Sequence, residues 1–98
     1  LRAVIEAMEA VDAAIAQLEA VVDAAGGILV VLADHGNADD MTKTAHTLNP
    51  VPFVIVDKNA NYTLADIPHA GLSNVAATLC YLLGFEPPSD YEPSLIVY

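Results

Sequence analysis

The feature that most constrains the fold is residues 28–33, an uninterrupted apolar run that reads Ile-Leu-Val-Val-Leu-Ala. A strand with one face in solvent alternates apolar and polar residues. This run does not alternate, so we expect a strand with both faces covered, as in a parallel sheet. A second such run follows at Phe53–Val56, and Pro52 is tolerable only at its start. Two strands do not make a stable sheet with both faces covered, so the other strands must come from further sequence or another chain.

A helix is predicted before the first strand. Apolar residues recur there at steps of 4, 3, 4, 3 and 4, which places them in one stripe on a helix: Val4, Met8, Val11, Ile15, Leu18 and Val22. Gly26 and Gly27 end this helix, because glycine tolerates a positive φ. Leu1 already lies inside the helical pattern, so we expect the natural polypeptide to extend upstream of it.

A second helical stripe lies between residues 72 and 83, with Ser73 or Asn74 as its cap and Gly84 at its end. The tail that follows contains three prolines and is predicted to be irregular. The order helix, strand, loop, strand, helix predicts an α/β fold with a helix–parallel sheet–helix layering. With 98 residues, the chain makes one small domain at most.

The charge balance narrows the choice of ligands. The chain has 13 Asp and Glu against 3 Lys and Arg, for a net charge of −10. This excludes nucleic acid and an anionic membrane surface as expected partners, since both are held by several basic residues. Arg2, Lys43 and Lys58 are also too few to grip a phosphorylated substrate, so cations from elsewhere would be needed. The longest uncharged stretch, 67–85, contains a proline and a histidine and is not a membrane span.

Polar residues with ligand potential concentrate between Asp34 and His46. Asp34, His35 and Gly36 come directly after the first strand, at the edge where open α/β sheets bind ligands. A carboxylate beside an imidazole suits Mn²⁺ or Zn²⁺. In an extended strand the two side chains would point to opposite faces, so the backbone must turn at Gly36 for both to reach one ion. On spacing alone a satisfied polar loop remains the alternative to a metal site.

Other polar residues favour structural roles. Asp39 and Asp40 are acids of an exposed loop, and Asn37 is expected to hold a turn. His69 is expected to be solvated or to cap an element, and Cys80 to be a small buried hydrophobe. A lone cysteine also excludes an internal disulfide and is typical of a reducing compartment. Ser73 has no neighbouring base in the sequence and is expected to be a cap rather than a nucleophile.

These motifs, taken in order, resemble the C-terminal part of cofactor-independent phosphoglycerate mutases, in the alkaline-phosphatase superfamily. The resemblance rests on VLADHGNA at 31–38, TAHT at 44–47 and NPVPF at 49–53. It extends to the opening helix and to the last helix and tail, through EAVD at 9–12, LSNVAAT at 72–78, LLG at 82–84 and PSLI at 93–96. The loop between His35 and His46 is shorter than in many members of the family.

The resemblance implies an alkaline-phosphatase-like fold, of which residues 1–98 are a C-terminal fragment of the metal-binding domain. The rest of that domain and the phosphotransferase domain would lie upstream. Such enzymes interconvert 3-phosphoglycerate and 2-phosphoglycerate through a phosphoserine, with two Mn²⁺ ions and without 2,3-bisphosphoglycerate. Asp34 and His35 would bind the ion beside the nucleophilic serine, and His46 would bind the other. The serine and the substrate-binding residues would be upstream, which leaves the fragment inactive.

The resemblance also implies a glycolytic, cytoplasmic parent enzyme. Two alternatives remain at this point. Another metal-dependent member of the superfamily, such as a phosphatase or a phosphopentomutase, would share the Asp-His-Gly motif, although the NPVP run at 49–52 favours the mutase. A non-catalytic module would instead keep the motif as a relic and self-associate through its open sheet edges.

Overall fold

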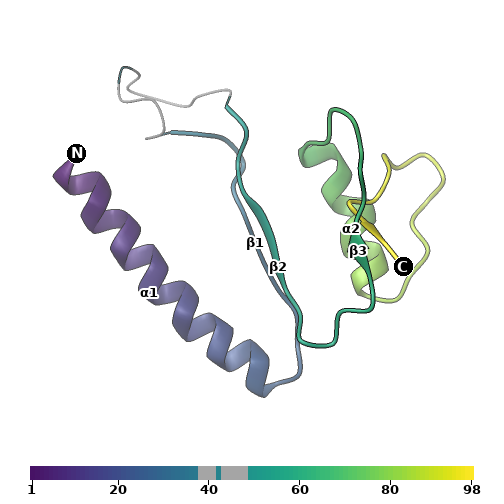
Figure 1. Ribbon diagram of the computed structural model, residues 1–98, viewed down its shortest axis with the longest axis horizontal. Helices are drawn as coiled ribbons and strands as arrows, with labels where there is room; N and C mark the ends of the chain where they lie inside the picture. The colour runs from purple at the N-terminus through teal and green to yellow at the C-terminus, as the bar shows by residue number, and fades with distance from the viewer. Residues whose placement is uncertain (38–41, 43–48) are drawn as a thin grey trace. The chain divides into compact units, whose positions relative to one another are not determined.

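The computed structural model describes residues 1–37, 42 and 49–98, and the chain divides into two compact units, Leu1–Lys58 and Asn59–Tyr98. Each unit contains a helix and a two-stranded sheet (Figure 1). Among the described residues, the fully buried apolar side chains are Ala77 and Ile96, and both belong to the second unit.

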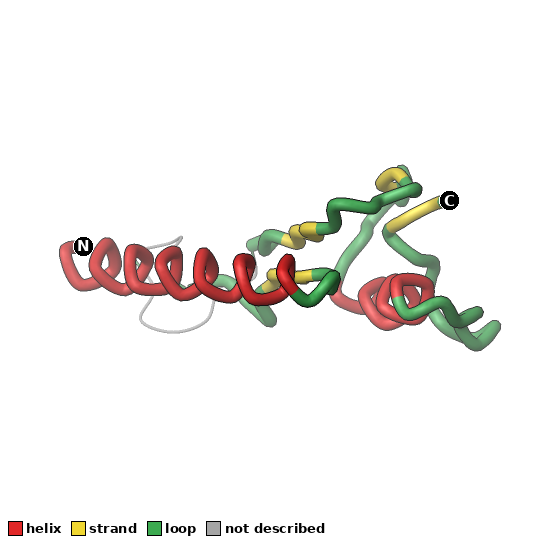
Figure 2. Tube along the Cα trace, turned by 90° about the horizontal axis from the view of Figure 1, so that it is seen from below, coloured by secondary structure: helices red, strands yellow, loops and turns green. Residues whose placement is uncertain are grey.

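The first unit opens with the helix α1, Arg2–Ala24, an unbroken coil of 23 residues (Figure 2). It covers the whole of the predicted apolar stripe. The helix ends as the sequence predicted, since Gly26 has a φ of +73°. The amide of Gly27 donates a hydrogen bond to the carbonyl of Val22 at 2.9 Å, which closes the last turn. No residue of α1 is fully buried within the unit.

The strands β1 (Leu29–Leu32) and β2 (Phe53–Val56) form the sheet of the first unit. They pair antiparallel, with Leu29 opposite Val56 and Leu32 opposite Phe53. The mixed helix and strand class is as predicted, but the parallel orientation is wrong for this pair. Residues 33–52 contain no apolar helical stripe, and a parallel pair requires a long crossover that is usually a helix. Leu32 and Val54 are exposed and the other strand residues are half-buried, so the strands are not covered on both faces within this unit.

The antiparallel register decides where the polar loop lies. Because Leu32 pairs with Phe53, the chain leaves β1 and enters β2 at the same edge of the sheet. Asp34, His35 and Gly36 therefore follow β1 beside the residues that precede β2. The candidate ligands lie at the carboxyl end of their own strand, as predicted, and at the amino end of its neighbour.

The second unit contains the strand β3 (Thr63–Leu64), a 3₁₀ turn η1 (Leu72–Asn74), the helix α2 (Val75–Leu82) and the strand β4 (Ile96–Val97). β3 and β4 pair antiparallel. The tail, predicted to be irregular, thus ends in a short strand. Gly84 ends the helical region with a φ of +85°, as predicted.

Asn74 and Thr78 are buried polar residues that attach the tail to α2. The Asn74 side chain accepts a hydrogen bond from the Gly71 amide and donates one to the Pro93 carbonyl, both at 2.8 Å. The Thr78 hydroxyl donates to the Asn74 carbonyl and accepts from the Leu95 amide, also at 2.8 Å. The sequence predicted Ser73 or Asn74 as the cap of this helical region. Asn74 does cap its start, because its side chain accepts the Gly71 amide at the beginning of η1. The helix α2 itself begins without a side-chain cap.

Candidate metal centre

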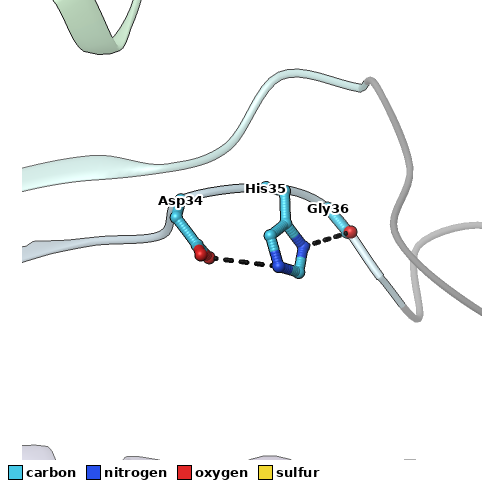
Figure 3. A network of polar contacts seen from close by, with 3 residues as sticks. All are labelled: Asp34, His35 and Gly36. Atoms are coloured by element: carbon cyan, nitrogen blue, oxygen red, sulfur yellow. Dashed lines mark hydrogen bonds and ion pairs between the residues drawn. The ribbon is translucent and has the colours of Figure 1, made fainter.

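The backbone bends at Asp34 and His35, directly after β1, and this bend brings their side chains together. Figure 3 shows the carboxylate and the imidazole on the same side of the chain. His35 Nε2 lies 3.4 Å from Asp34 Oδ1. In an extended strand these neighbours would point to opposite faces, so the bend is what brings them together. The sequence predicted that the chain turns here, but at Gly36, and the bend lies just before it, at Asp34 and His35.

The two side chains differ in their exposure to solvent. The Asp34 side chain is 85% exposed and the His35 side chain is 32% exposed. The carboxylate is therefore accessible to an ion or a ligand from solvent, while the imidazole is held by its surroundings. This is a suitable arrangement for a binding site, because only one of the two groups must be ordered when a ligand arrives.

A backbone contact sets the protonation pattern of the imidazole. His35 Nδ1 lies 2.9 Å from the carbonyl oxygen of Gly36 (Figure 3). A carbonyl can only accept, so the contact assigns the hydrogen to Nδ1 and gives Nε2 the lone pair in the neutral ring. A ring whose second nitrogen donates to a carbonyl is the usual arrangement for a histidine that binds a metal. No sequence pattern predicts this contact, because it depends on the side-chain rotamer.

The donor pair fits a divalent ion. An acidic oxygen and a lone pair on nitrogen repel one another unless a cation or a proton lies between them. Nitrogen and oxygen ligands lie about 2.0–2.2 Å from a bound transition metal, which puts neighbouring donors about 2.8–3.6 Å apart between octahedral and tetrahedral geometry. The separation of 3.4 Å between Nε2 and Oδ1 falls within that range. One carboxylate and one imidazole suit Mn²⁺ or Zn²⁺.

The other predicted candidates do not join this pair within the described part of the chain. His46, Asp39 and Asp40 lie outside the described residues. Among the residues that are described, no group of three His, Cys, Asp or Glu side chains could hold a metal ion. His69 is exposed, as predicted, and Cys80 is half-buried and free rather than fully buried. His69 also has a φ of +57°, which the sequence did not predict.

The described basic side chains are engaged away from the donor pair. Arg2 Nε lies 3.3 Å from Glu6 Oε1 on α1, and Lys58 Nζ lies 2.9 Å from Asp23 Oδ1. Both pairs are solvent-exposed to a large degree, so each contributes about 0–1 kcal/mol to stability. Each of these cations is paired with an acid other than Asp34, whose carboxylate lies beside His35. The described residues thus provide two metal donors, but none of them is an unpaired lysine or arginine that would bind a phosphate there.

Comparison with known families places these observations in context. The model of the metalloenzyme superfamily matches residues 1–87, which is most of the chain. The chain belongs to the metalloenzyme superfamily. The match includes the Asp34–Gly36 segment and both strands of the first unit.

Two relatives of this chain are both described as 2,3-bisphosphoglycerate-independent phosphoglycerate mutases. The chain is 42% identical to the 2,3-bisphosphoglycerate-independent phosphoglycerate mutase of Trypanosoma brucei brucei and 41% identical to that of Mesembryanthemum crystallinum. In both cases 98% of this chain is covered but only 21% of the relative. The chain thus spans about a fifth of the length of the curated relatives it matches. The family resemblance seen in the motifs is confirmed.

A solved structure shows the same fold. The Leishmania mexicana phosphoglycerate mutase, crystallised at low cobalt concentration, superposes with a TM-score of 0.89 at 42% identity. The match covers 98% of this chain and 21% of that protein. The fold is therefore that of one segment of a phosphoglycerate mutase.

The alignments with these relatives also bear on the loop. The alignment with the trypanosome protein runs over 117 residues, more than the 98 in this chain. The relative therefore has residues without a counterpart here, which agrees with a shortened loop but does not locate the difference. Separately, none of the described helices has the length and apolar character needed to cross a membrane.

Proposed function

We propose that this chain forms part of a cofactor-independent phosphoglycerate mutase, a glycolytic enzyme of the cytoplasm. In that enzyme 3-phosphoglycerate and 2-phosphoglycerate are interconverted through a phosphoserine. The identities of 41–42% to mutases over 98% of the chain support the proposal. The remaining four-fifths of the relatives' length would supply the serine and the groups that bind the substrate.

Within this function, Asp34 and His35 hold one Mn²⁺ and His46 contributes to the second. The ions, when bound, lower the pKa of the attacking hydroxyl and offset the charge of the transferred phosphoryl group. Asp34 supplies a negative oxygen donor. His35 supplies Nε2, and the Gly36 carbonyl holds its ring through Nδ1. The observation that carries the assignment is the approach of Nε2 and Oδ1 to 3.4 Å on one side of the chain.

The first test is a calorimetric titration of the chain with Mn²⁺ at pH 7.5. Removal of the carboxylate charge in Asp34→Asn is expected to weaken binding by about tenfold or more, since metal sites depend strongly on their ligands. Asp12→Asn makes the same chemical change at an exposed position of α1 and should leave the affinity unchanged. His46→Ala tests the residue that lies outside the described part of the chain.

The titration also has a pH arm. A proton competes with the metal for Nε2, so affinity should be weaker at pH 5.5 than at pH 7.5. Equal affinities of the wild-type chain and Asp34→Asn would contradict the assignment of Asp34. Affinity that does not change with pH would contradict a histidine ligand.

A further inference from the structure

No further inference is drawn: the strongest candidate, the tyrosine cluster of the second unit in which the exposed Tyr98 ring meets those of Tyr62 and Tyr81 edge to face, is the tail's own packing against α2, and nothing in the part of the chain that the structure describes shows which ligand or partner would cover it.

Discussion

At the scale of the residue, Thr78 is a buried side chain whose hydrogen bonds connect several parts of the second unit. Its side chain is fully buried, and its hydroxyl connects the Asn74 carbonyl to the Leu95 amide. The Leu95 carbonyl in turn accepts from Ala65, beside β3. Thr78 thus links α2, the tail and the β3–β4 pair through one oxygen atom.

Replacement of Thr78 by valine is therefore expected to destabilise the second unit by about 1–3 kcal/mol, because it leaves the part-buried Leu95 amide without its acceptor. Thr63→Val makes the same change on the exposed strand β3 and should cost little. Urea unfolding measures the stabilities, and amide exchange by NMR reports on Leu95. Unchanged exchange at Leu95 in Thr78→Val would show that the hydroxyl does not hold the tail.

Two glycines of the same unit give a second test at this scale. Gly84 has a φ of +85°, while Gly71 is extended at −160°, and a Cβ would meet nothing within 4 Å at either. Gly84→Ala should therefore cost about 1–2 kcal/mol from backbone strain alone. Gly71→Ala should be neutral or stabilising by about 0.4–1 kcal/mol, because alanine restricts the unfolded chain. Urea midpoints that shift equally would contradict the role assigned to the backbone of Gly84.

At the scale of the element, the sequence predicts those features that local chemistry determines. The stripe from Val4 to Val22 gave α1, and β2 has the predicted bounds. The strands β3 and β4 were not predicted, because each has two residues and they pair across about thirty intervening positions. The orientation of β1 against β2 was also wrong, since an apolar run reports burial and carries no information on direction.

The candidate site likewise has some features that the sequence predicts and others that it does not. The adjacency of Asp34 and His35 and the turn near Gly36 follow from three consecutive residues and were predicted. The Nδ1 contact with the Gly36 carbonyl depends on a rotamer, which no sequence pattern specifies. The spacing of residues alone does not predict which distant side chains join the site, because their approach depends on the path of a long loop.

At the scale of the whole molecule, the small number of basic residues limits what the isolated chain can catalyse. A phosphoryl-transfer site needs metal ions and also cations that bind the anionic substrate. The chain has three Lys and Arg, of which Arg2 and Lys58 form ion pairs with Glu6 and Asp23. We therefore expect no conversion of 3-phosphoglycerate by the isolated chain, even with Mn²⁺ at saturation. A coupled assay for 2-phosphoglycerate measures this, and the full-length trypanosome mutase is its positive control. Turnover by the isolated chain that Asp34→Asn abolishes would contradict the expectation, because it would mean that nucleophile, metal and substrate binding are all present in 98 residues.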